Sequence, residues 1–167
     1  QVSAAQGHVV SWAILGPLPG EEEAYQLSVP FRADEKVEIG TPLKAPGAED
    51  LAWTVLTSER VDGAIEFFSL LEEVASAFAY LAADVRSPKA QAASARCDVR
   101  GLVQLWLNSA PLAQAGKDVP KRLQVNLVEG ANRFVARVRQ TKERRDSSFR
   151  IRLADEKGAA LAGVHQE

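Results

Sequence analysis

The fold is decided by residues 123–139, which read LQVNLVEGANRFVARVR. Apolar and polar side chains alternate in period two over residues 123–127 and again over residues 134–139. Alternation of this kind places the apolar side chains on one face of a β-strand, and the Gly and Asn of the intervening Glu129-Gly130-Ala131-Asn132 are typical turn residues. The stretch therefore predicts two half-buried strands joined by a turn.

Similar patterns lie on both sides of this stretch. Residues 102–107 are followed by the pair Asn108-Ser109 and by residues 111–113, which predicts a tight hairpin because Asn tolerates a positive φ. Residues 149–153 alternate Phe, Ile and Leu with Arg and predict a further strand. The first 63 residues contain many Gly and Pro turn residues between short apolar stretches, which excludes long helices there.

The middle of the chain fits two secondary structures. Apolar residues between positions 64 and 83 recur at spacings that suit a helix as well as a strand. We predict a strand over residues 75–85, with Phe78, Tyr80 and Ala82 on one face, because the other elements are strands. One short helix near residues 65–75 stays open.

Length and composition fit one globular domain. The chain has 167 residues, of which 46% are hydrophobic and 25% charged, and several short strands with turns between them predict an all-β sandwich or barrel. We expect a single domain over residues 1–158 and a frayed tail over the Ala- and Gly-rich residues 159–167. Nowhere do about 18 consecutive apolar residues occur, so no transmembrane segment is predicted.

Three motifs resemble those of galactose-binding-like jelly-roll modules. They are SWAILGPL at residues 11–18, VQLWLN at residues 103–108 and LVEGANRF at residues 127–134. The resemblance implies a jelly-roll β-sandwich of about eight or more strands. Such modules are frequently appended to secreted bacterial glycosidases, sulfatases and surface proteins, so it also implies carbohydrate binding and an extracytoplasmic location, whether periplasmic, secreted or on the cell surface. The small, polar start without Met suits a mature exported protein or an excised piece of one.

Catalytic and cofactor chemistry has little support in the sequence. The only imidazoles, His8 and His165, lie near opposite termini, which argues against a His-based metal site, and Cys97 is the single cysteine, interpreted as a buried, inert thiol. Neither a Gly-x-Ser-x-Gly motif nor a glycine-rich phosphate loop occurs. We therefore expect a non-catalytic chain without a cofactor, apart from one open alternative, a structural calcium ion held by turn carboxylates among Glu49, Asp50, Asp84 and Asp98.

Aromatic side chains offer one route to a sugar ligand, because pyranose rings stack on exposed aromatic rings. Trp53, Tyr25 and Trp106 are the candidate platforms. For Trp53 and Tyr25, which lie beside loop segments, core packing and ligand stacking are equally favoured. Trp12 is expected in the core because its neighbours Val10 and Ile14 share its face.

Charge is distributed unevenly along the chain. The formal net charge of -2 excludes a globally basic nucleic-acid binder, but residues 1–116 hold 8 basic and 15 acidic side chains, whereas residues 117–152 hold 11 basic and 4 acidic ones. If the strands on either side of residues 141–147 pair as a hairpin, four arginines share one solvent face: Arg137, Arg139, Arg150 and Arg152.

These arginines allow two interpretations. Arg forks match sulfate and carboxylate, so they could form a patch for a sulfated or uronic polysaccharide or for an acidic protein. Alternatively they are the solvated face of a sheet, paired with acidic residues such as Glu21-Glu22-Glu23. Nucleic acid is not expected, because Phe149 is in phase with the core rather than with the arginines.

The sequence thus predicts a non-catalytic binding module of an exported bacterial protein, with a carbohydrate as its partner. The alternative is an interaction subunit that docks onto a larger extracytoplasmic assembly and has no sugar affinity.

Overall fold

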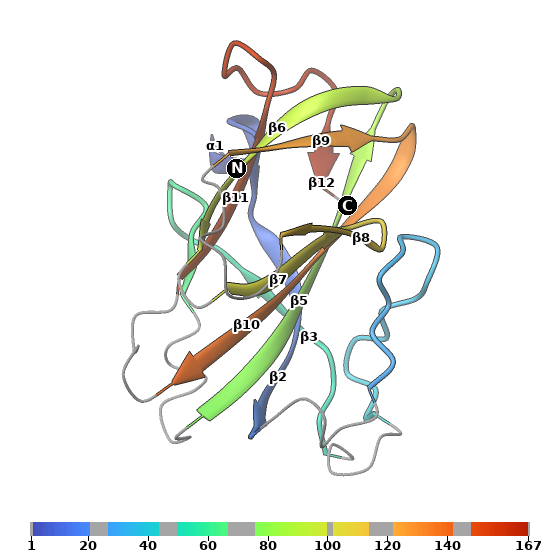
Figure 1. The fold of residues 1–167 in the computed structure, drawn as a ribbon, viewed down its shortest axis with the longest axis vertical. Coiled ribbons are helices and arrows are strands. Elements are labelled where there is room, and N and C mark those ends of the chain that lie inside the picture. Colours follow the sequence, from blue (N-terminus) through green and yellow to red (C-terminus); the bar gives the residue numbers. More distant parts are fainter. Residues whose placement is uncertain are drawn as a thin grey trace.

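A computed structural model describes residues 2–20, 27–43, 50–66, 76–99, 102–113, 122–141 and 148–166. Two antiparallel sheets make up almost all of these residues, which confirms the predicted all-β sandwich. In Figure 1, β6, β9 and β11 lie in the upper part of the view and the long strands β2, β5 and β10 run below them. Within the described ranges, no helix has the length and apolar character needed to span a membrane.

Each sheet is built from strands that are distant in the sequence. The smaller sheet has the order β1 (His8–Val9), β11 (Ser148–Ala154), β6 (Gln91–Val99) and β9 (Arg122–Leu127), with β4 (Ile65–Glu66) also paired to β11. The larger sheet has the order β3 (Thr54–Thr57), β2 (Ser11–Pro19), β5 (Ser76–Ser87), β10 (Gly130–Thr141), β7 (Leu102–Leu107) and β8 (Ala110–Ala113), with β12 (His165–Gln166) also paired to β5. A short helix, α1 (Val2–Ala5), precedes β1.

The main core lies between the two sheets. Trp12 of β2 meets Phe149 of β11 edge to face, with ring centroids 4.6 Å apart, so one aromatic pair joins the sheets. The placement of Trp12 in the core was expected from the sequence. Cys97 also faces this core, and burial raises the pKa of its thiol to about 12, which agrees with the interpretation of an inert thiol.

A second apolar layer covers the opposite face of the larger sheet. Its buried members include Leu15, Phe78, Tyr80 and Val135, and partly buried apolar residues of the segment 27–43 pack against them. The central strands β5 and β10 are therefore buried on both faces. A strand of this kind is continuously apolar rather than alternating, which explains why residues 75–85 fitted two periodicities, and the predicted strand there is confirmed.

One buried arginine fastens this outer layer to the sheet. Arg133 of β10 is 4% exposed and donates to both carboxylate oxygens of Asp84, its cross-strand partner on β5, at 2.7 and 2.6 Å. Its remaining Nη1 donates to the carbonyl oxygens of Pro30 and Glu35, at 3.3 and 2.7 Å. The guanidinium thus satisfies loop carbonyls and a carboxylate together, as its fork of donors allows.

The predicted turns have mixed outcomes. The hairpin of β7 and β8 is confirmed, with Asn108 and Ser109 at φ of 49° and 67°. The predicted hairpin of β10 and β11 is wrong, because β10 lies between β5 and β7 while β11 belongs to the smaller sheet. Alternation fixes which face of a strand is buried, but it does not fix the neighbouring strand. Of the open helix near residues 65–75, Ile65–Glu66 form strand β4 and residues 67–75 lie outside the described part.

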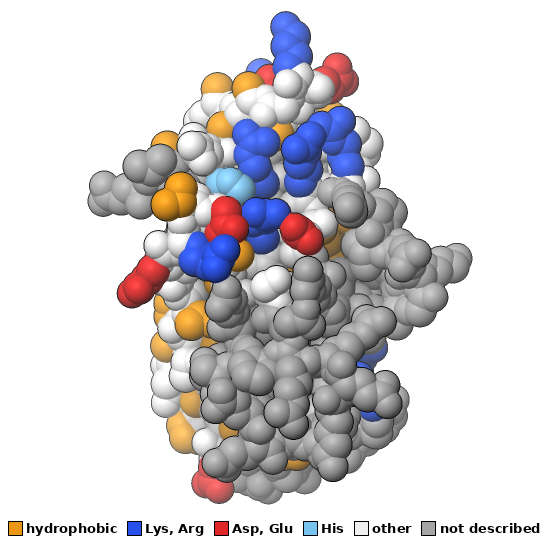
Figure 2. Space-filling model, turned by 90° about the vertical axis from the view of Figure 1, so that its left-hand side faces the viewer, with side chains coloured by type: hydrophobic (Ala, Val, Ile, Leu, Met, Phe, Trp, Pro, Cys, Tyr) orange, Lys and Arg blue, Asp and Glu red, His pale blue; other side chains and the backbone are white. Residues whose placement is uncertain are grey.

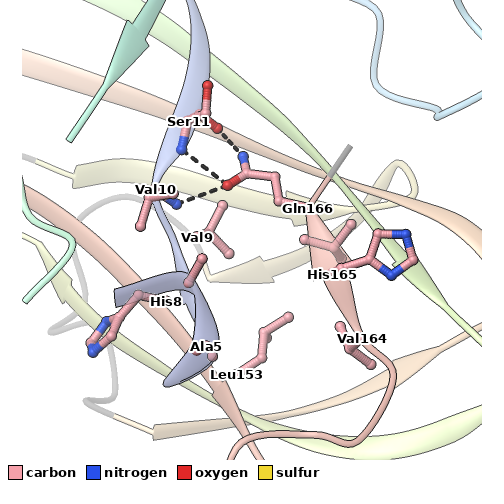
Figure 3. Close-up of a pocket in the computed structure, with 12 residues that line it drawn as sticks. Ala5, His8, Val9, Val10, Ser11, Leu153, Val164, His165 and Gln166 are labelled. Carbon is pink, nitrogen blue, oxygen red and sulfur yellow. Dashed lines mark hydrogen bonds between the residues drawn. The ribbon is translucent and has the colours of Figure 1, made fainter. Parts of the chain in front are cut away.

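The C-terminal residues are paired, which corrects the expectation of a frayed tail. β12 pairs with β5, and the side chain of Gln166 bonds the start of β2 (Figure 3). Gln166 Oε1 accepts from the backbone N–H groups of Val10 and Ser11, at 2.9 and 3.0 Å, and its Nε2 donates to the carbonyl of Ser11. The side-chain amide therefore acts like a peptide group of a neighbouring strand, and these bonds offset the entropy of ordering the tail.

Replacing this amide should destabilise the fold. We expect Gln166→Ala to lower the free energy of unfolding by about 1–3 kcal/mol, because two backbone N–H groups and one carbonyl lose their partner. Urea denaturation measures the change. The control is His165→Ala, whose exposed side chain should cost little; an equal loss in both variants would contradict the role of the amide.

Candidate anion-binding site

A row of basic side chains crosses the outer face of the smaller sheet. Its inner face is defined by core residues such as Val9, Ile151 and Cys97, so the side chains between them point outward. The strand register places four outward side chains opposite one another on neighbouring strands, in the order His8, Arg152, Arg96 and Arg122. We call this set the cationic row; it runs from β1 across β11 and β6 to β9.

The row lines a surface hollow. The hollow has a volume of about 490 Å³, and Asp98 and Arg150 complete its wall beside the four residues of the row and Cys97. Figure 2 shows this face, with Lys and Arg side chains gathered around a histidine and acidic side chains at the lower border of the cluster. A volume of this size lies within the range of small-ligand sites.

Two carboxylates balance charge at one border of the hollow. Arg150 Nη2 lies 2.6 Å from Asp98 Oδ2, and Nη1 lies 3.3 Å from Asp62 Oδ2. The hydrogen bond that Asp62 accepts from Arg60, together with one from the backbone of Ala64, lowers its pKa to about 2. Asp62 therefore stays ionised at any pH where the protein is folded, and Arg150 is neutralised by these partners.

The arginines of the row lack such compensation. Arg152 is held by backbone carbonyls, donating from Nε to Gln6 and from Nη2 to Gly158, both at 2.9 Å, which orient it without cancelling its charge. Arg96 and Arg122 are exposed and, in the part of the chain that the structure describes, neither has a carboxylate within ion-pair distance. Like charges directly opposite each other across a sheet are destabilising, so the row is a region of uncompensated positive charge.

His8 closes the row at β1. Its Nδ1 is buried and has no hydrogen-bond partner among the described residues. Burial lowers the pKa of the imidazole first, and the charges of Arg152 and Arg150 lower it further, while Asp62 opposes them. Without a ligand, the ring is therefore neutral at neutral pH, with an unused polar atom beside two guanidinium groups.

The structure divides the predicted arginine patch. Arg150 and Arg152 lie at the hollow, whereas Arg137 and Arg139 lie on the outer face of the larger sheet, opposite Tyr80 and Phe78 in the register. Burial and the charge of Arg139 lower the pKa of Arg137. The four arginines do not share one face, because β10 and β11 belong to different sheets.

The site also contains residues that sequence reasoning missed, namely His8, Arg96 and Arg122. A signal for Arg96 existed, since Ala95 and Cys97 flank it and mark it as outward. The sequence carries no signal that would bring it beside Arg122 and Arg152.

The aromatic candidates are placed away from an open surface. Trp53 is 3% exposed in the second apolar layer, and this placement corrects the expectation of an open platform there. Trp106 is half-buried and packs edge to face against Phe31, with centroids 4.9 Å apart. Tyr25 lies outside the described residues. Stacking on these rings is therefore not the feature that distinguishes this surface.

The turn carboxylates do not form a cluster. Asp84 pairs with Arg133 in the larger sheet, and Asp98 pairs with Arg150 in the smaller one. Asp50 is exposed, and Glu49 lies outside the described residues. Among the residues described, no group of three or more His, Cys, Asp or Glu side chains is placed to hold a metal ion.

The motif residues that suggested jelly-roll modules have structural roles. Gly16 has φ of +133°, and a Cβ atom there would lie 2.9 Å from the Cβ of Ala79, so the close approach of β2 and β5 requires glycine. Asn132 accepts from Asn108 Nδ2 at 3.1 Å and from the N–H of Val128 at 2.8 Å, and it donates back to the Val128 carbonyl at 2.9 Å. These side chains hold turns together and leave the cationic row as the candidate ligand surface.

Comparison with known proteins adds no relative: no protein-family model, no curated protein and no solved structure matches the chain. The geometry of the cationic row therefore has to carry the functional argument.

The uncompensated charge of the row predicts an unusual stability effect. We expect Arg96→Gln to raise the free energy of unfolding by about 0.2–1 kcal/mol at low salt, because it removes repulsion from cross-strand neighbours on both sides. The gain should fade at high ionic strength. Urea denaturation at two salt concentrations measures it, with Lys157→Gln, the same charge change at an exposed turn, as the control. A loss of stability in Arg96→Gln would show that the arginine is internally compensated.

Proposed function

We propose that the chain is a non-catalytic binding module of an exported bacterial protein and that it binds an anionic carbohydrate at the cationic row. One observation carries this proposal. Arg152, Arg96 and Arg122 stand on three adjacent strands around a hollow, and no carboxylate of the described residues neutralises them. An anionic ligand would supply the missing countercharge.

The chemistry of the hollow favours sulfate or carboxylate groups on a sugar. A guanidinium presents a planar fork of N–H donors that bonds two oxygens of such a group at once. The wall of the hollow is polar and charged, with the imidazole of His8 as its only ring, so charge and hydrogen bonding dominate over stacking. A concave site also suits a sugar substituent better than it suits a flat protein surface.

The fold and the thiol support the rest of the proposal. From β5 to β11 the chain passes repeatedly between the two sheets, an order that supports a jelly-roll arrangement and hence the resemblance to galactose-binding-like modules. Cys97 faces the core with a pKa of about 12, so its thiol is protonated and unreactive at neutral pH. Both features suit a module that recognises a ligand without changing it.

The second candidate is an interaction subunit without sugar affinity, and one observation favours it. β3 ends the larger sheet, and its Val55 is 58% exposed; Val61, shortly after β3, is 74% exposed. An edge strand with exposed apolar side chains can pair with a strand of another protein. This surface is distinct from the cationic row, so the two candidates respond to different substitutions.

Binding to charged glycans tests the proposal. We expect sulfated and uronic oligosaccharides, but not neutral ones, to bind, and to bind more weakly as salt is raised from about 50 to about 500 mM. The double variant Arg96→Gln, Arg122→Gln should bind about ten- to a hundredfold more weakly, since a hydrogen bond to a charged group contributes about 1.5–3 kcal/mol. Isothermal titration calorimetry measures the change, and Lys157→Gln is the charge-matched control.

Other outcomes would redirect the assignment. Salt-insensitive binding of neutral sugars would contradict the role of the row. Absence of any glycan binding, together with partner capture that Val55→Lys abolishes, would favour the interaction subunit.

A further inference from the structure

This inference rests on the proposed function and assigns the part of the ligand that each end of the site contacts. We propose that the hollow beside His8 is a subsite for one sulfate or carboxylate group, bound by the imidazole of His8 and the guanidinium of Arg152, and that the ligand is a polyanion that continues across the strands towards Arg96 and Arg122.

The direction of the ligand follows from the register. His8, Arg152, Arg96 and Arg122 occupy directly opposed positions on four consecutive strands of the smaller sheet. Neighbouring strands are about 4.8 Å apart, so the row extends over about 14 Å at right angles to the strands. A ligand with a single anionic group would engage only part of this row, whereas a chain of charged sugars reaches all of it.

His8 has the features of a ligand contact. Its Nδ1 is buried without a hydrogen-bond partner in the part of the chain that the structure describes, and such atoms are rare because burial without a partner is costly. Its neighbour in the register, Arg152, is already oriented by the carbonyls of Gln6 and Gly158. The geometry therefore offers one oriented cation and one unused imidazole nitrogen on the same side of the sheet.

The charges around His8 set the sign of its pH response. Arg152 and Arg150 of β11 disfavour the imidazolium and Asp62 favours it, while Asp98 and Arg96 of β6 and Arg122 of β9 line the same hollow. Burial and the two β11 arginines hold the pKa of His8 below its usual value. A bound anion favours the imidazolium, so it raises that pKa and binding takes up a proton. Affinity should therefore increase as the pH falls through the range where histidine titrates.

The test measures binding at two pH values with defined probes. The probes are a sulfated hexasaccharide, an oligogalacturonate hexasaccharide and inorganic sulfate, titrated by calorimetry at about pH 7.5 and about pH 5.5, where a histidine changes charge. We expect both hexasaccharides to bind about three- to tenfold more tightly at the lower pH, since one unit of pKa change corresponds to a factor of ten. Inorganic sulfate alone should bind much more weakly, because it occupies only the subsite.

Two substitutions separate His8 from general effects of pH. His8→Gln should retain salt-sensitive binding but lose its pH dependence, whereas His165→Gln, which removes the chain's only other imidazole, should behave like the natural sequence. An NMR titration of the His8 ring needs no substitution, and saturation with either hexasaccharide should raise its pKa.

The outcomes distinguish the two levels of the argument. Salt-sensitive hexasaccharide binding with the same pH dependence in His8→Gln, or an unmoved His8 pKa, would overturn the subsite and leave the proposed function intact. Equal affinity for inorganic sulfate and the hexasaccharides would overturn the extended ligand. Absence of binding to all anionic probes would overturn both proposals.

Discussion

The pairing of β5 with β10 is the constraint on which the remaining structure depends. These strands pair over twelve residues, from Gly130 opposite Ser87 to Thr141 opposite Ser76. One face of the pair forms the main core with the smaller sheet, and the other is covered by the second apolar layer. Because both faces of these strands must be buried, the segment 27–43 has to be held against the sheet, and Arg133 holds it through a carboxylate and two backbone carbonyls.

This arrangement makes the two sheets unequal. The larger sheet uses its outer face for packing, so aromatic side chains such as Trp53 and Tyr80 are buried there. The smaller sheet leaves its outer face to polar and charged side chains, among them the exposed Arg96, Gln124 and Asn126. A ligand surface made of charges therefore belongs on the smaller sheet, and β1, a two-residue strand at its edge, adds the imidazole of His8.

The sequence predicted what depends on local pattern and missed what depends on distant pairing. Alternation over residues 123–127 identified β9, and the Asn108-Ser109 turn identified the hairpin of β7 and β8, because period two and a positive φ are local properties. Half of the predicted arginine patch lies elsewhere, since the chain after β10 enters the other sheet. His8 and Arg122 are more than a hundred residues apart, and only the register of the four strands places them in one row.

The row is also an exception to how this chain treats its arginines. Arg32 bonds Asp34, Arg60 bonds Asp62, Arg133 bonds Asp84 and Arg150 bonds Asp98, each at 3.0 Å or less. Carboxylates are plentiful in a chain with 22 acidic residues, so a lack of them does not explain why Arg96 and Arg122 face each other without one. Repulsion across a sheet opposes folding, and substitution to a neutral residue would relieve it. A sequence that retains the repulsion gives up stability that an anionic ligand restores on binding, which is the behaviour expected of a binding surface rather than of a solvated sheet face.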